Sequence, residues 1–339
     1  MIRIRDYYLS YSTTLDFRTT LPFSQSPFQL HHRQSVLALG SCFAEHIGQR
    51  LIDRKFGLTL NPFGILYNPA SILGSLRLLE AGRPVERGEL FQHQDLWHHF
   101  SFHSRFSHPD APTALEQMNA SITEVHRNWE AIDRLILTWG TAYAYRHLGQ
   151  DEIVANCHKL PGETFERFRL KGESIVETYT EFLSRLKKDK PGLQVLISVS
   201  PVRHLRDGLV DNQRSKAVLL LAAETLSQEL DFVHYFPAYE LVLDDLRDYR
   251  FYDRDLAHPN SVAVDYVWDY FRRACFSPEA QAIDARIDPV LRAARHRPFH
   301  TDTAAFRKFC TQQLEKIAEL EAQFPFIDLS KEKQHFLNG

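Results

Sequence analysis

The sequence predicts an α/β fold in which helices cover both faces of a parallel sheet. Short apolar strands alternate with amphipathic helical segments, which is the pattern of strands joined by helical crossovers. Three strands, at 35–40, 134–140 and 193–200, are almost continuously apolar, as expected for strands buried on both faces. The first strand ends in Gly40 and leads directly into a helix over 43–54. This unit of strand, turn and helix recurs along the chain, and its repetition predicts the fold class.

The remaining elements follow from local signals taken along the chain. Gly57 begins a second short strand that breaks into a loop at Pro62, and Asn68-Pro69 starts a helix with leucines at helical spacing. Pro191-Gly192 marks the turn into the strand at 193–200. The further elements expected are a helix over 173–188, a long amphipathic helix over 212–230, a strand over 232–236 and a helix beginning near Ser261.

Outside this core the chain divides into an arm, an insertion and an extension. Residues 1–34 show no sustained periodicity, and we interpret them as an N-terminal arm lying over an α/β domain at 35–274. An insertion at about 81–128 is dense in histidine and aromatic residues, and we interpret it as a lid or pocket wall. Residues 275–339 turn polar but carry apolar residues at helical spacing over 303–324, so a helical C-terminal extension is expected.

Composition restricts the functional classes. The net charge of −3 offers no basic field for nucleic acid, and no nucleic-acid-binding motif is present. No apolar run reaches the length of a signal-peptide core or a membrane span. The four cysteines are too few and too scattered for a disulfide scaffold. We therefore expect a cytoplasmic, reduced protein without a nucleic-acid partner or a membrane span, and no oligomeric state is predicted.

Ser41 is the first candidate catalytic residue. It lies on the turn before the helix over 43–54, where unpaired N–H groups and the helix dipole stabilise an anion. The alternative is a serine that only caps the helix, which is the commonest role at this position. Far along the chain, Asp255 precedes His258 by three residues, and this spacing supplies a base together with the carboxylate that orients it. The residues predict a triad of Ser41 as nucleophile, His258 as base and Asp255 as orienting group.

Five separated stretches resemble the GSCFA family, a group of SGNH-like (GDSL-like) hydrolases. They are Gly40-Ser41-Cys42-Phe43-Ala44, which is the motif in the family's name, and the stretches 61–69, 156–159 and 200–203, followed by the Asp255/His258 block. The likeness runs from about Phe17 to about Tyr270. It implies a three-layer α/β/α, flavodoxin-like fold and a serine esterase without a cofactor. By analogy with the family, it also implies a small, carbohydrate ester as the substrate.

The oxyanion hole departs from the pattern of this superfamily. Many SGNH enzymes carry Gly-x-Asn-Asp after the third strand, and the asparagine donates to the oxyanion. Here the sequence is Gly140-Thr141-Ala142-Tyr143, so that asparagine is absent. The candidates for donors are the side chains of Thr141, Asn68, Asn156 and His158 and the backbone amide of Gly64. For Gly64, which the resemblance places after the second strand, the alternative is an ordinary turn glycine.

Three residues are candidates for contact with the substrate, namely His103, His158 and Arg203. Arg203 follows the strand at 193–200, at the sheet edge where ligands bind in open α/β sheets. Its charge suits an anionic substrate group, and the alternative is an arginine that bridges loop carboxylates such as Asp207. The histidines of the insertion match no standard ligand spacing, so no metal is predicted.

Other chemistry at the same position stays open. Cys42 adjoins Ser41 and is an alternative nucleophile, because a thiol near a helix N-terminus has a lowered pKa. Cys42 and His46 together with Cys157 and His158 would supply four zinc ligands, although no Cys-x-x-Cys pair supports that site. An acyltransferase would use the same triad as an esterase. A non-catalytic binding module on the same fold is the alternative from a different functional class.

Overall fold

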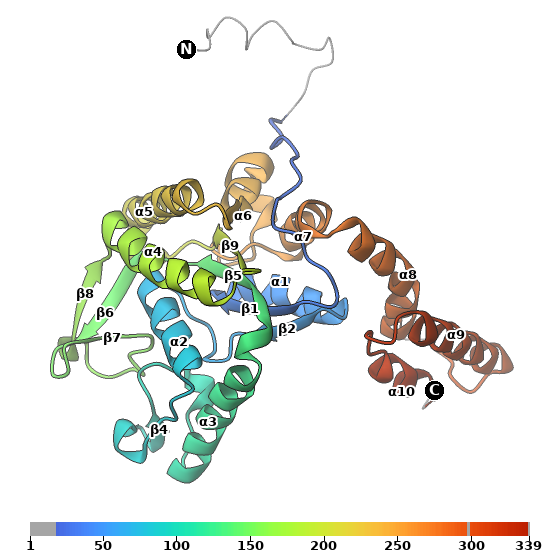
Figure 1. The fold of residues 1–339 in the computed structure, drawn as a ribbon, viewed down its shortest axis with the longest axis horizontal. Helices are drawn as coiled ribbons and strands as arrows, with labels where there is room; N and C mark the ends of the chain where they lie inside the picture. Colours follow the sequence, from blue (N-terminus) through green and yellow to red (C-terminus); the bar gives the residue numbers. More distant parts are fainter. Residues whose placement is uncertain (1–17, 297–298, 338–339) are drawn as a thin grey trace, which may run out of the picture.

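A parallel sheet forms the centre of the protein, for which the computed structural model describes residues 18–296 and 299–337 (Figure 1). Its five strands lie in the order β10-β9-β5-β1-β2, and each neighbouring pair is parallel. Their bounds are β1 (Ser35–Gly40), β2 (Gly57–Leu60), β5 (Ile132–Trp139), β9 (Gln194–Val199) and β10 (Val233–Phe236). The strand order reverses between β1 and β5, and open sheets of this kind bind ligands at the carboxyl ends beside that point.

Helices cover both faces of the sheet (Figure 1). On one side lie α2 (Pro69–Ala81), α3 (Ala111–Arg127), α4 (Gly172–Asp189) and α5 (Gly208–Glu229), and on the other α1 (Cys42–Asp53) and α7 (Ser261–Cys275). Because side chains alternate along a strand, Leu37 and Leu39 enter the first core while Val36 and Ala38 enter the second. This arrangement confirms the predicted three-layer fold. Among the described residues, no helix is long and apolar enough to cross a membrane.

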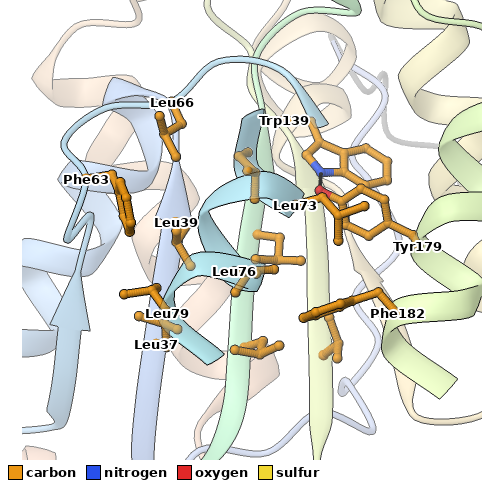
Figure 2. Packing of buried hydrophobic residues seen from close by; sticks show 14 of the residues in the cluster. Leu37, Leu39, Phe63, Leu66, Leu73, Leu76, Leu79, Trp139, Tyr179 and Phe182 are labelled. Carbon is orange, nitrogen blue, oxygen red and sulfur yellow. Dashed lines mark hydrogen bonds between the residues drawn. The ribbon is translucent and has the colours of Figure 1, made fainter. Parts of the chain in front are cut away.

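The larger core holds the strand end that borders the candidate site (Figure 2). Trp139, the last residue of β5, packs edge-on against Tyr179 of α4, with ring centroids 5.2 Å apart. The Trp139 indole N–H donates to the Tyr179 hydroxyl at 3.3 Å, and that hydroxyl donates to the Pro69 carbonyl at 2.9 Å. Two helices are therefore bonded to the end of β5, which stabilises the position of Gly140 and Thr141 just beyond it.

Several short elements occur where the sequence predicts none. A small antiparallel sheet follows β5, with strand order β7-β6-β8 and bounds β6 (Tyr143–His147), β7 (Glu152–Val154) and β8 (Phe165–Arg169). A hairpin of β3 (Phe91–His93) and β4 (Leu96–His98) lies in the insertion. After β10 comes α6 (Ala238–Glu240), which continues as a π-helical segment over Leu241–Leu246. The long helix α5 begins at Gly208 rather than at Asn212.

The insertion at 81–128 differs from the expected lid. Its second half is α3, which begins after Asp110, whose side chain accepts from the Thr113 amide at 2.9 Å. The residues that α3 buries recur at helical spacing and join the larger core, namely Ala111, Ala114, Met118, Ile122 and Val125. None of the insertion's residues lines the cavity that contains Ser41. The apolar side of α3 makes this half of the insertion a structural layer rather than a cover.

The segment before β1 lies against the end of α7. Leu30 pairs with Phe276 through a parallel bridge, and Phe28 and Leu30 are fully buried. The predicted arm includes residues 1–17, which lie outside the described residues. Beyond α7 the helices α8 (Pro278–Arg295), α9 (Ala304–Gln323) and α10 (Ser330–Leu337) form a hydrophobic cluster of their own. They confirm the predicted helical C-terminal extension, with α8 as an additional helix.

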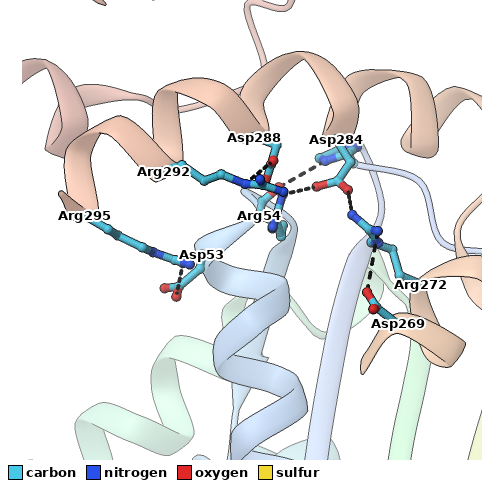
Figure 3. Close-up of polar contacts among 9 residues, drawn as sticks. Asp53, Arg54, Asp269, Arg272, Asp284, Asp288, Arg292 and Arg295 are labelled. Atoms are coloured by element: carbon cyan, nitrogen blue, oxygen red, sulfur yellow. Dashed lines mark hydrogen bonds and ion pairs between the residues drawn. The ribbon is translucent and has the colours of Figure 1, made fainter. Parts of the chain in front are cut away.

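Buried ion pairs attach the C-terminal helices to the end of α1 (Figure 3). Arg54, directly after α1, contacts Asp284 at 2.8 Å and Asp288 at 2.6 Å. The Asp284 side chain is 3% exposed and also contacts Arg272 of α7 at 3.0 Å. Losing either arginine would leave a buried carboxylate with one cation fewer, which is costly in a low-dielectric interior. The extension is thus fastened to the α/β domain on the side away from the larger core.

Candidate active site

Ser41 occupies a tight junction between β1 and α1. Gly40 has φ +154°, and a Cβ there would lie 2.3 Å from the Thr138 carbonyl oxygen, so only glycine allows β1 and β5 to approach this closely. Ser41 is the N-cap residue of α1, yet its hydroxyl makes no capping hydrogen bond. Its Oγ is buried and has no hydrogen-bond partner among the described residues. The serine therefore does not perform the capping role that was the alternative.

A cavity of about 310 Å³ opens onto Ser41 at the carboxyl ends of β1, β5 and β9. Its lining residues come from the ends of these strands, from the small antiparallel sheet and from the loop before α7. They are Ser41, Cys42, Tyr67, Thr141, Tyr145, Arg167, Val202, Arg203, His204, Arg206, Asp207 and His258. Two predicted triad members, Ser41 and His258, thus face one cavity although more than half of the chain separates them.

His258 and Asp255 form a hydrogen-bonded pair on the loop before α7. The distance between His258 Nδ1 and Asp255 Oδ2 is 2.6 Å, and Asp255 Oδ1 accepts from the amides of Ala257 at 2.9 Å and His258 at 3.0 Å. These two N–H groups, His258's first, and then the His258 ring lower the pKa of Asp255 to about 2. An ionised carboxylate only accepts, so Nδ1 carries the proton and Nε2 of a neutral His258 is left as the basic nitrogen.

Cys42 lines the same cavity but is not electrostatically activated. Burial raises the pKa of its thiol, and the N–H groups of the first turn of α1 only partly oppose this effect. The lowered pKa expected from its place at the helix start is therefore wrong. Burial likewise raises the pKa of Cys157 to about 11. Among the described residues no group of three or more His, Cys, Asp or Glu side chains gathers to hold a metal, so the four zinc ligands considered above are not brought together.

Gly64 and His103 pack against each other away from the cavity lining. Gly64 has φ +82°, and a Cβ there would lie 2.2 Å from the Cβ of His103. The Gly64 amide donates to the Asn61 carbonyl at 2.7 Å, which is the bond of a tight turn. His103 Nδ1 accepts from the Arg105 amide at 3.2 Å. Gly64 is therefore a turn glycine, and neither Gly64 nor His103 lines the cavity that contains Ser41.

Three further candidates are engaged in local structure. Asn68 caps α2, where its Oδ1 accepts from the Ser71 amide at 2.9 Å. Asn156 accepts from the His158 amide at 2.9 Å, and the ring of His158 lies 2.9 Å from the His99 carbonyl. Burial lowers the pKa of His158 to about 4, so this ring is neutral where it packs against the insertion. None of these three side chains lines the cavity. Each is instead hydrogen-bonded at the start of a helix or to a neighbouring loop.

Thr141 and Arg203 do reach the cavity. Thr141 Oγ1 lies 3.1 Å from Ser215 Oγ and accepts from the Tyr143 amide at 3.1 Å, so it is already bonded on two sides. The Arg203 guanidinium lies over the rings of Tyr249 and Tyr252, 5.2 Å and 4.6 Å from their centroids. Among the described residues no carboxylate pairs with Arg203, and its neighbour Asp207 pairs with Arg167 instead.

Sequence reasoning missed two residues that complete the site. His204 follows Arg203 in the same stretch after β9, and its position at the sheet edge was the signal available. Lys216 lies in the middle of α5, 1% exposed, and its Nζ donates to the carbonyls of Gly140 at 2.5 Å and Ser200 at 2.6 Å. It carried no signal, because a lysine within an amphipathic helix normally faces solvent. Lys216 joins the ends of β5 and β9 beneath the cavity.

The fold and the site together have the layout of an SGNH-like protein. That layout is a doubly wound sheet with a serine after the first strand and an Asp-x-x-His pair before a late helix. This chain belongs to the GSCFA family, whose sequence model matches residues 35–271, and the model of the GSCFA domain protein C-terminal domain matches residues 287–339. No curated protein matches the sequence.

Among solved structures, the chain is similar to an acetyl xylan esterase from the rumen bacterium Butyrivibrio proteoclasticus, with 11% identity and a TM-score of 0.34. That match covers 72% of this chain and spans 64% of the esterase chain.

Proposed function

We propose that this protein is a serine-dependent acyl-ester hydrolase with Ser41, His258 and Asp255 as its triad. The observation that carries the proposal is the unpaired, buried hydroxyl of Ser41 in the same cavity as a histidine that a carboxylate orients. A binding module would have no need of an unsatisfied hydroxyl beside an oriented imidazole. The small cavity suits a small ester, and by family analogy a carbohydrate acetyl ester is the substrate we would test first.

The reaction follows from these groups. Nε2 of His258 takes the Ser41 proton while Oγ bonds to the ester carbonyl carbon, and the carbonyl π electrons move to its oxygen. Collapse of this tetrahedral intermediate breaks the bond to the alcohol, which leaves with the proton from His258. Water then attacks the acyl-serine, gives its proton to His258, and releases the acid as Ser41 is restored. An acyltransferase differs only in the hydroxyl compound that replaces water.

The proposal is tested by fluorophosphonate labelling of purified protein. We expect wild-type protein and Cys42→Ala to be labelled, and Ser41→Ala and His258→Ala to lose labelling by at least about 10³-fold in rate. Cys42→Ala is the matched control because its side chain lines the same cavity one residue away. Labelling that survives Ser41→Ala would contradict the proposal and point to a different nucleophile. Folded wild-type protein that is not labelled would contradict it and favour the binding module. Products from an acetyl ester with and without an added sugar alcohol separate hydrolysis from transfer.

The charges of the cavity also favour an ester that carries an anionic group. Among the described residues, Arg203 and Arg206 pair with no carboxylate; Arg203 lies over two tyrosine rings and Arg206 donates to the Tyr145 hydroxyl at 2.8 Å. Asp207 is the acidic side chain in the lining, and it is paired with Arg167 at 2.5 Å. Two arginines preorganised by tyrosines and lacking an acid thus face the space beside Ser41.

We expect Arg203→Gln and Arg206→Gln each to raise KM for a carboxylate-bearing ester about tenfold, the usual effect of one charged hydrogen bond. KM for a neutral ester of similar size should stay within about twofold. Arg250→Gln is the control, since this arginine pairs with Asp248 outside the cavity. Steady-state kinetics on a matched pair of charged and neutral nitrophenyl esters measures the difference. Equal changes for both esters would show that the arginines serve the cavity wall and not an anion.

A further inference from the structure

Two buried polar atoms at the cavity have no hydrogen-bond partner among the described residues: Oγ of Ser41 and Nε2 of His204. Buried polar atoms are paired in the great majority of cases, and each exception requires an explanation. The free hydroxyl of Ser41 is explained by its role as nucleophile. The free ring nitrogen of His204 is not used by the triad and requires a role of its own.

Both residues border one small space above Gly140. A Cβ built on Gly140 would lie 3.1 Å from the Tyr67 carbonyl oxygen, 3.3 Å from His204 Nε2 and 3.5 Å from Ser41 Cβ. Because glycine has no side chain, this space is open to a ligand atom bound at Ser41. The Gly140 backbone lies close enough to the His204 ring to raise its pKa slightly, but the Gly140 carbonyl already accepts from Lys216 at 2.5 Å.

The orientation and charge state of the ring suit a donor. The edge of the Tyr67 ring meets it with centroids 5.7 Å apart and planes at 87°, and the His204 amide donates to Asn212 Oδ1 at 2.9 Å. Burial, and after it the charge of Lys216, lower the pKa of His204 to about 4. At neutral pH the imidazole is therefore uncharged and carries a single N–H. No carboxylate among the described residues pairs with this ring, in contrast to His258.

We propose that Nε2–H of His204 donates the side-chain hydrogen bond to the oxyanion that forms at Ser41. In this chain Ala142 stands where related enzymes carry the asparagine donor, and Thr141 Oγ1 is bonded to Ser215 and Tyr143. His204 reaches the same space from the end of β9 instead of β5. The inference rests on the proposed ester chemistry. The proton stays on His204 throughout, so the residue stabilises charge and transfers nothing.

The test replaces His204 by Leu, which has no donor, and by Asn, which has an N–H donor but cannot act as a base. We expect His204→Leu to lower kcat for p-nitrophenyl acetate about 10²- to 10³-fold with KM within about threefold, the loss typical of one oxyanion donor. His204→Asn should recover at least tenfold of that loss. His234→Leu is the control, since this histidine of β10 bonds to Gln194 outside the cavity.

The outcomes separate this inference from the triad. If wild-type protein is labelled by fluorophosphonate through Ser41 while His204→Leu retains full kcat, the triad stands and the donor role is overturned. If His204→Asn is as inactive as folded His204→Leu, His204 acts as a base, which also overturns it. Should His204→Leu fail to fold, His204→Asn decides alone: its pH–rate profile must keep the acidic limb of wild type at a kcat within about 10²-fold. If wild-type protein is not labelled, the proposed function itself has failed.

Discussion

Asp255→Asn is expected to lower kcat for ester hydrolysis by about 10³- to 10⁴-fold, with little change in KM. The amide cannot accept from His258 Nδ1 through its NH₂ group and cannot stabilise the imidazolium that forms during attack. It also weakens the turn in which Asp255 Oδ1 accepts from the amides of Ala257 and His258. Because the pKa of Asp255 is held at about 2, the native carboxylate is ionised throughout any practical assay range. Steady-state kinetics between pH 5 and pH 9 would measure the loss.

Asp253→Asn is the matched control for this experiment. Asp253 lies in the same loop, and its backbone amide donates to the His258 carbonyl at 2.8 Å, which the substitution preserves. Its effect on kcat should stay within about threefold. A loss for Asp255→Asn no larger than that of the control would mean that His258 is oriented by the loop backbone and that Asp255 is dispensable.

The strand, turn and helix around Gly40 could be predicted because they depend on local sequence. The apolar strand is buried from Val36 onward, and α1 buries Phe43, Ile47 and Leu51 at helical spacing. Both elements begin and end within a residue or two of the expected bounds. The parallel direction of the strands then follows from chain connectivity, since helical crossovers join parallel strands. A parallel sheet of this kind predicts a ligand site at the carboxyl ends of its strands. Ser41, Thr141 and Arg203 follow such strand ends, and all three line the cavity.

The oxyanion donor that we propose could not be predicted, because its position depends on which loops meet in space. The sequence after β5 shows only that an asparagine is missing. That His204 reaches the space above Gly140 follows from the register between β5 and β9, where Thr138 pairs with Ser198, and no periodicity encodes that register. Short strands such as β6 escaped prediction for a related reason. Its residues are half-buried, and strand propensity depends on such surroundings more than helix propensity does.

The position of Lys216 shows most clearly what the sequence pattern does not predict. Within α5 its neighbours include both polar and apolar residues, so the helical pattern alone does not indicate that its Nζ is buried. The reason for its burial lies in the carbonyls of Gly140 and Ser200, which end β5 and β9 and accept from Nζ. Backbone groups beyond a strand end have lost their sheet partners and require others when buried. A lysine from the covering helix supplies both hydrogen bonds.

Lys216→Met should therefore lower the free energy of unfolding by about 2–4 kcal/mol, because two buried carbonyls lose their donor. Urea denaturation would measure the change. Lys190→Met is a matched comparison, since the buried Nζ of Lys190 donates to the Trp129 carbonyl at the opposite edge of the sheet. That variant should also lose stability but keep wild-type kcat, whereas Lys216→Met should lower kcat because the Gly140 and Ser200 ends of the strands are no longer joined beneath Ser41.

The pH dependence of the free energy of unfolding tests the charge state of Lys216 more sharply than a measurement at a single pH. Burial lowers the pKa of Lys216 to about 7 from its ordinary value of 10.5, so between these values the unfolded chain binds a proton that the folded chain does not. Stability from this group therefore rises with pH across the window, by up to about 1.4 kcal/mol per pH unit, and the full penalty applies below pH 7. Lys216→Met lacks this contribution, so the advantage of wild type over the variant should widen between pH 7 and pH 10. A constant difference would show that Lys216 is charged in the folded protein and is held as an ammonium by the two carbonyls.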